Sequence, residues 1–277
     1  MQFVDIKNGI AFRKIFGNQN KKIILISFLN AVMKLEGSSR IADVEILNPY
    51  QLPIIKNLKA SIIDVKARDK RGKTYIIEMQ VAEPDGLDKR LLYYASKEYS
   101  QQIESGEQYP KLAPVIFIGI FDFPFTPGTK YLSHHAVCDI ENGDRVIKDM
   151  DFYFIELPKF NQPLASLTEL TDKWIYFIKE AESLTVIPDN VDDEGLKEAY
   201  HDANKHSWEK EELEAYDYSA MREQDERGKI ELAEKKGESK KETETVIKLH
   251  VKGRSDEEIS DLLDIPIERV REITKQY

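Results

Sequence analysis

Three polar side chains lie within otherwise apolar stretches of this sequence. Asp64 lies in the run IIDV, and Glu78 and Gln80 alternate with apolar residues in the run YIIEMQV. Successive side chains of a β-strand point to opposite faces, so Glu78 and Gln80 would share one face. A carboxylate in so apolar a run is costly to bury without compensation. We therefore expect a cation beside Asp64.

A divalent metal ion is one way to compensate these carboxylates. Oxygen ligands from Asp64 and Glu78, together with the backbone carbonyl of Met79, suit Mg²⁺ or Mn²⁺. Such an ion lowers the pKa of a bound water and neutralises charge that develops on phosphate oxygens during in-line displacement. The pattern is thus compatible with metal-dependent phosphodiester hydrolysis.

An arrangement without metal is also compatible with the spacing. Asp64 could form a buried ion pair with Lys59 or Arg90, while Glu78 and Gln80 face water on an amphipathic sheet. The pattern D-x13-E-x-Q does not separate these two interpretations by itself.

The elements that must position these residues form a recognisable order. Residues 58–67 and 74–81 are rich in β-formers and are joined by the polar, glycine-containing segment 68–73, which predicts a hairpin. Hydrophobic spacing predicts helices in 5–16, from Asn20 to Gly37 and in 87–103, and strands in 41–47 and 113–121. The predicted order is helix, strand, strand, strand, helix, strand.

Composition divides the rest of the chain. A strand within 146–157 and a helix in 167–184 would complete a first domain, 1–188. Acidic and basic residues number 24 and 24 in 1–188, 19 and 10 in 189–244, and 7 and 6 in 245–277. We therefore expect an acidic helical connector at 189–244 and a small tail at 245–277, and the net charge of -10 leaves room for a basic face on the first domain.

Three motifs together carry a family resemblance: F-R-K-I-F-G at 12–17, I-E-M-Q at 77–80 and R-x-x-Y-Y at 90–94. Over roughly residues 3–180 the chain resembles the recombination-promoting nuclease (putative transposase) family of the PD-(D/E)XK superfamily. The resemblance implies the α/β fold class, with an αβββαβ core in which helices flank a mixed sheet, followed here by a helical C-terminal extension. It also implies metal-dependent cleavage of double-stranded DNA, linked to recombination or transposition, with Asp64 and Glu78 as metal ligands.

The sequence departs from the superfamily at one position, where Gln80 replaces the usual lysine. Glutamine can orient a water molecule but supplies no positive charge. Lys66, at i, i+2 from Asp64, is the first candidate for a substitute catalytic cation, and Arg90 and Lys59 are candidates for DNA binding. A catalytically degenerate nuclease fold that binds DNA or protein is the alternative function.

The tail contains helix-forming signals. Ser255 and Glu258 form a capping-box sequence, and apolar residues mark a second helix at 267–275. The pattern resembles a helix-turn-helix, in which the second helix would enter a major groove. A small bundle that contacts protein, or a homo-oligomer formed through these C-terminal helices, remains the alternative.

Other features limit the class of protein. The single cysteine, Cys138, excludes an internal disulfide framework. No apolar run reaches the ~20 residues of a membrane span, and the first residues lack a secretory pattern. We expect a cytoplasmic protein without membrane contact.

Overall fold

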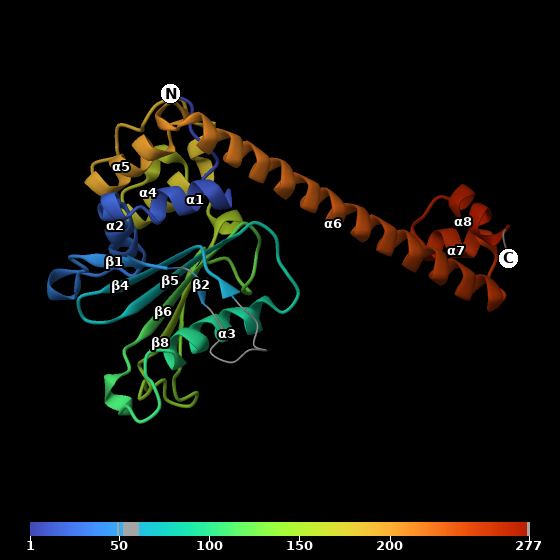
Figure 1. Ribbon diagram of the computed structural model, residues 1–277. Helices are drawn as coiled ribbons and strands as arrows, with labels where there is room; N and C mark the ends of the chain where they lie inside the picture. Colours follow the sequence, from blue (N-terminus) through green and yellow to red (C-terminus); the bar gives the residue numbers. More distant parts are fainter. Residues whose placement is uncertain (49, 52–60, 276–277) are drawn as a thin grey trace. The chain divides into compact units, whose positions relative to one another are not determined.

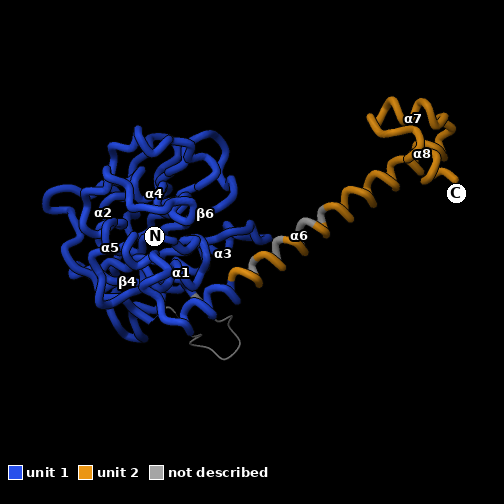
Figure 2. The backbone as a smooth tube through the Cα atoms, turned by 90° about the horizontal axis from the view of Figure 1, so that it is seen from above, with its two compact units in different colours: residues 1–219 blue, residues 220–277 orange. Residues whose placement is uncertain are grey.

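The computed structural model describes residues 1–48, 50–51 and 61–275. The chain divides into two compact units, Met1–Ser219 and Ala220–Tyr277 (Figure 2). Lys59 lies outside the described residues, so its two expected roles stay predictions.

Unit 1 is organised around a six-stranded mixed sheet with the order β1-β4-β5-β6-β8-β7. Its strands are β1 (Val44–Leu47), β4 (Val65–Asp69), β5 (Thr74–Gln80), β6 (Val115–Phe121), β7 (Leu132–Ala136) and β8 (Met150–Glu156). The pairs β5·β6 and β6·β8 are parallel, and the other pairs are antiparallel. A separate short pair joins β2 (Tyr50–Gln51) to β3 (Ser61–Ile62).

Helices cover both faces of this sheet (Figure 1). One face carries α1 (Gly9–Phe16), α2 (Lys22–Val32), α4 (Leu170–Glu180) and α5 (Glu194–Ala203), and the other carries α3 (Leu87–Ser100). Side chains of β5 alternate between the two cores: Tyr75, Ile77 and Met79 belong to the larger one, and Ile76 to the one under α3. Glu78 and Gln80 therefore point to the α3 side.

Local sequence explains where the first helices begin and end. The Asn8 side chain accepts hydrogen bonds from the amides of Ile10 and Ala11, which caps α1, and Gly17 follows its last residue. Short 3-10 turns connect the longer elements at Gln19–Lys21, Gly37–Ser39, Tyr109–Lys111, Leu157–Lys159, Leu164–Ser166, Ala181–Ser183 and Lys205–Ser207.

The predicted fold class is confirmed, with two differences in detail. Residues 61–69 form two strands, β3 and β4, separated by a bend at Asp64 rather than one continuous strand. The edge strand β7 was not predicted, because its sequence LSHHA is short and partly exposed and therefore lacks an apolar alternation.

The first compact unit continues past the division expected after residue 188 and ends at Ser219. Helix α5 packs on α2, and a Cβ atom at Gly195 would lie 2.5 Å from the Ile23 carbonyl oxygen, so this close approach requires glycine. Trp208 and Tyr216 are buried in the larger core.

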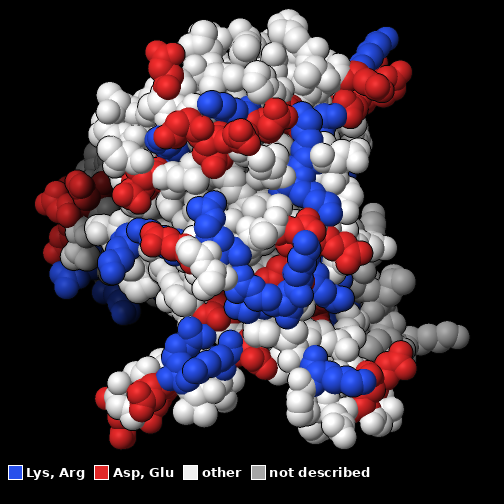
Figure 3. Space-filling model, turned by 90° about the vertical axis from the view of Figure 1, so that its left-hand side faces the viewer, with Lys and Arg blue, Asp and Glu red and all other residues white. Residues whose placement is uncertain are grey.

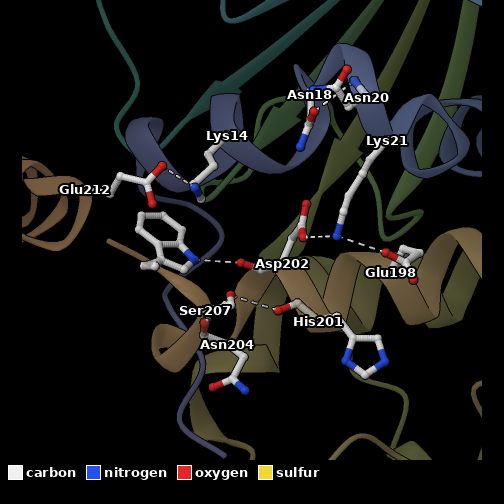
Figure 4. Close-up of polar contacts among 11 residues, drawn as sticks. Lys14, Asn18, Asn20, Lys21, Glu198, His201, Asp202, Asn204, Ser207 and Glu212 are labelled. Carbon is white, nitrogen blue, oxygen red and sulfur yellow. Dashed lines mark hydrogen bonds and ion pairs between the residues drawn. The ribbon is translucent and has the colours of Figure 1, made fainter. Parts of the chain in front are cut away.

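Polar contacts also hold this segment to the first helices (Figure 4). Lys21 forms an ion pair with Glu198 at 3.0 Å and another with Asp202. Lys14 forms an ion pair with Glu212 and lies 5.0 Å from the ring centre of Trp208. The acidic residues of 189–219 therefore lie mainly on the solvent-facing side of helices whose other side is packed in the core.

Unit 2 is a small helical bundle that begins within α6 (Lys210–Val251), a helix that spans the division between the units. Its core brings the end of α6 together with α7 (Asp256–Leu263) and α8 (Ile267–Thr274) through Val246, Ile259, Val270 and Ile273. The predicted capping box at Ser255 is present. No helix among the described residues is both long and apolar enough to cross a membrane.

Candidate active site

Asp64 and Glu78 meet on the α3 side of the sheet. The last paired residues before them are Val65 and Ile77, which places the two acids opposite each other one step further along the hairpin. The Asp64 amide donates to Glu78 Oε1 at 3.2 Å, and the Met79 amide donates to Asp64 Oδ2 at 3.0 Å. The bend at Asp64 thus turns its side chain toward the backbone of β5.

Gln80 and the Met79 carbonyl complete this group on β5. Gln80 Nε2 donates to Glu78 Oε2 at 3.1 Å, so the amide side chain lies beside the second carboxylate. The Asp122 amide donates to the Gln80 carbonyl at 2.9 Å on the β6 side. Because carbonyls alternate along a strand, the Met79 carbonyl faces the opposite side, toward Asp64.

Both carboxylates have raised pKa values for the same main reason. Burial disfavours the charged form of each acid. Burial and the neighbouring Asp64 charge raise the pKa of Glu78 to about 8, and the Arg90 charge opposes this. Burial raises the pKa of Asp64, against the Met79 amide and the Arg13 guanidinium. The pair is therefore under-compensated by the described part of the chain.

Arg13 on α1 is the ion-pair partner of Asp64. Its Nη1 lies 2.9 Å from Asp64 Oδ1, and its side chain is 42% exposed against 14% for Asp64. Sequence reasoning expected Lys59 or Arg90 in this role and missed Arg13, which lies 51 residues away in the chain. The available signal was its place in the F-R-K-I-F-G motif, as a cation between core phenylalanines.

Arg90 on α3 approaches both acids without a salt bridge to either within 4.0 Å among the described residues. Its charge lowers the pKa of Asp64 and of Glu78. Its guanidinium carbon lies 5.9 Å from the ring centre of Tyr94, and its Nε atom is buried without a hydrogen-bond partner in the described structure. This cation therefore borders the carboxylates, and one of its buried donors is unpaired among the described residues.

Lys66 lies on the same face but bonds elsewhere. Its Nζ atom lies 3.0 Å from Glu98 Oε2 on α3, and both side chains are nearly buried. Arg68 lies 4.0 Å from the other oxygen of Glu98. The Lys66 charge is therefore neutralised by Glu98 rather than directed at Asp64. Among the described residues, Arg90 and Arg13 are then the cations next to the carboxylate pair.

The donor set suits a divalent cation. Two carboxylates and a carbonyl are hard oxygen donors of the kind that Mg²⁺ and Mn²⁺ prefer, with further positions left to water and substrate. The described residues contain no cluster of three or more His, Cys, Asp or Glu side chains of ligating geometry. Asp64, Glu78 and the Met79 carbonyl would thus supply three oxygen ligands of a partial coordination sphere.

Charges of both signs lie side by side on one face of the surface. On the face shown in Figure 3, Lys and Arg side chains gather beside Asp and Glu side chains. Lys22 and Lys70, for example, each lie 3.6 Å from Asp43. In unit 2, Arg269 and Arg271 of α8 pair with Glu242 and Glu257 at 3.0 Å. The helix expected to recognise DNA therefore has two of its cations neutralised.

Comparison with known proteins identifies a family for this chain. A model of the PD-(D/E)XK nuclease family transposases matches residues 6–233, which is more than half of the chain and includes every residue of the candidate site. The comparisons with curated proteins and with solved structures gave no match. On the family match and the αβββαβ core, this chain belongs to the PD-(D/E)XK nuclease family transposases.

Proposed function

We propose that this protein is a DNA endonuclease that depends on Mg²⁺ or Mn²⁺ and takes part in recombination or transposition. The observation that carries this proposal is the pair of largely buried carboxylates, Asp64 and Glu78, whose pKa values are both raised. Glu78 accepts a hydrogen bond from the Asp64 amide, and Asp64 accepts one from the Met79 amide. A purely structural pair would be expected to have enough donors to hold both charges.

The residues of the site have separate roles in this proposal. Asp64, Glu78 and the Met79 carbonyl would hold the ion, which when bound supplies an activated water and a counter-charge for the phosphate. Gln80 would orient the attacking water through its amide, since it already lies beside Glu78. Arg90, whose charge acts on both carboxylates, would contact the phosphate with its guanidinium, in place of the lysine that Gln80 replaces.

A plasmid-nicking assay tests this function. The purified chain should convert supercoiled plasmid to nicked or linear forms in Mg²⁺ or Mn²⁺, and chelation should stop the reaction. The Glu78→Gln variant should be inactive under the same conditions. Metal-independent nicking, or equal nicking by Glu78→Gln, would refute the assignment, whereas DNA binding without any nicking would support a degenerate binding module.

A further inference from the structure

The guanidinium of Arg13 occupies the position next to Asp64 that a bound cation would need. Arg13 Nη1 donates to Asp64 Oδ1 at 2.9 Å, while Asp64 Oδ2 already accepts from the Met79 amide. A dication on Asp64 would meet the positive charge of Arg13 at short range in a poorly screened site. The ion pair seen here and a bound metal ion therefore oppose each other.

Arg13 is also free to move without disturbing the core. Its side chain is 42% exposed, although it comes from a helix whose Phe12 and Ile15 are fully buried. The guanidinium lies over Gly9, where a Cβ atom would be 3.4 Å from Nη1, so the glycine leaves room beside it. The guanidinium can thus leave Asp64 while α1 stays packed.

Once the Arg13 guanidinium has left Asp64, a phosphate group is the partner that fits its chemistry. Arginine presents planar donors that match phosphate oxygens, and Gln80 brings no charge of its own. Lys66, a further cation on this face, forms an ion pair with Glu98. A substrate phosphate at the two carboxylates would therefore lie near Arg13, which pairs with Asp64, and near Arg90, whose charge acts on both acids.

On the basis of the proposed function, we propose that Arg13 exchanges partners during the reaction: it neutralises Asp64 in the metal-free protein and is displaced by the metal ion onto the DNA phosphate. Arg13 would neutralise Asp64 in the empty site and would then position the substrate. Its removal should consequently have opposite effects on metal binding and on cleavage.

The test compares Arg13→Gln and Arg13→Lys with a matched control, Arg145→Gln. Arg145 lies before β8 and forms an ion pair with Asp151 of β8 at 3.0 Å, with similar exposure, 35% and 15%. Asp151 lies at the level of Tyr75, near the start of β5. Mn²⁺ affinity of the full chain is measured by calorimetry, DNA affinity in Ca²⁺ by fluorescence anisotropy, and nicking in Mg²⁺.

We expect Arg13→Gln to bind Mn²⁺ about three- to tenfold more tightly, because the competing charge is gone. The same variant should bind DNA more weakly and should nick about 10²-fold more slowly. The DNA affinity and the nicking rate of Arg13→Lys should fall between those of the wild type and Arg13→Gln, since lysine keeps the charge but loses the planar donors. Arg145→Gln should leave all three measurements unchanged.

Two failures are distinguishable. Unchanged or weaker Mn²⁺ binding in Arg13→Gln, with wild-type nicking intact, would refute the exchange of partners and leave the proposed function standing. A wild-type protein that neither binds Mn²⁺ nor nicks DNA would refute the proposed function, and the exchange with it.

Discussion

Two glutamates of unit 1, each almost completely buried, show how differently a fold can treat the same side chain. Glu156, at the end of β8, accepts hydrogen bonds from the amides of Phe125 and Thr126 at 2.6 and 3.0 Å and lies 2.6 Å from Lys159 Nζ. These donors hold its pKa below the usual range despite burial. Glu156 is thereby a fully compensated anchor for the loop after β6.

Glu78, at the far end of β5, has donors only from the Asp64 amide and the Gln80 side chain among its described contacts. Another carboxylate lies beside it, and its pKa is raised. Glu156 has a cation, Lys159, in contact with its carboxylate, and Glu78 has none among its described contacts. We infer that the buried acid without a paired cation is the one that serves function. The following predictions test this contrast.

The largest effect should follow loss of a carboxylate at the hairpin. Asp64→Asn and Glu78→Gln should each lower nicking by about 10³-fold, because the ion loses a charged ligand. The melting temperature of the metal-free variants should stay the same or rise, because repulsion between the two acids is relieved. Thermal melts with and without Mg²⁺, read beside nicking, check this. A destabilised Asp64→Asn variant that does not respond to metal would show that Asp64 serves the fold.

The opposite result, a loss of stability without a loss of nicking, is expected for Glu156. Glu156→Gln leaves Lys159 without its carboxylate in a buried setting and should lower the free energy of unfolding by about 3 kcal/mol. Urea denaturation measures this loss. Nicking per folded molecule, assayed well below the transition, should remain at the wild-type level. Wild-type stability in Glu156→Gln would remove the contrast between the two glutamates.

A third difference should appear in the pH dependence of stability. The pKa of Glu78 is about 8 in the folded chain and about 4.3 when unfolded. Between these values the native state binds more protons, so metal-free stability should fall by about 1 to 2 kcal/mol from pH 6 to pH 8. Glu156 has a lowered pKa, so its contribution is constant in this window and is lost only at acidic pH.

The variant Glu78→Gln supplies the control for this titration. Its stability should be nearly flat between pH 6 and pH 8, and saturating Mg²⁺ should flatten the wild-type curve as well, because the ion favours the carboxylate. Equal slopes in the wild type and in Glu78→Gln would assign the titration to another group.

The smallest effect on nicking is expected at Gln80, where the superfamily usually has a lysine. Gln80→Lys places a cation beside Glu78 Oε2, where the glutamine amide now donates at 3.1 Å. This charge should lower the pKa of Glu78 and should preserve nicking or raise it by up to about tenfold. Single-turnover nicking rates measure the change. A large loss of nicking would indicate that the neutral amide has a role that a cation cannot fill.

The sequence predicted the core and the carboxylate pair because both depend on local pattern. Alternation along β5 placed Glu78 and Gln80 on one face, and the polar turn 68–73 brought Asp64 to them. Arg13 could not be found in this way, because its contact with Asp64 depends on how α1 packs against the sheet. Nor does charge alone identify a partner, as Lys66 shows by bonding Glu98.

The extension of unit 1 past residue 188 was not predicted, for a different reason. Average composition over 189–244 is dominated by exposed Glu and Lys, whereas α5 buries Leu196, Ala199, Tyr200 and Ala203 at helical spacing. The apolar side of this helix was therefore present in the sequence, but it was hidden by averaging over a segment that contains two different environments.

Helix α1 limits how this sequence can change in length. The neighbouring residues Arg13 and Lys14 serve separate partners, Asp64 on the hairpin and Glu212 on α6. One inserted or deleted residue turns the rest of an α-helix by about 100°. Such a change between Asn8 and Arg13 would remove both ion pairs at once, so related chains should tolerate substitutions in this segment far better than insertions or deletions.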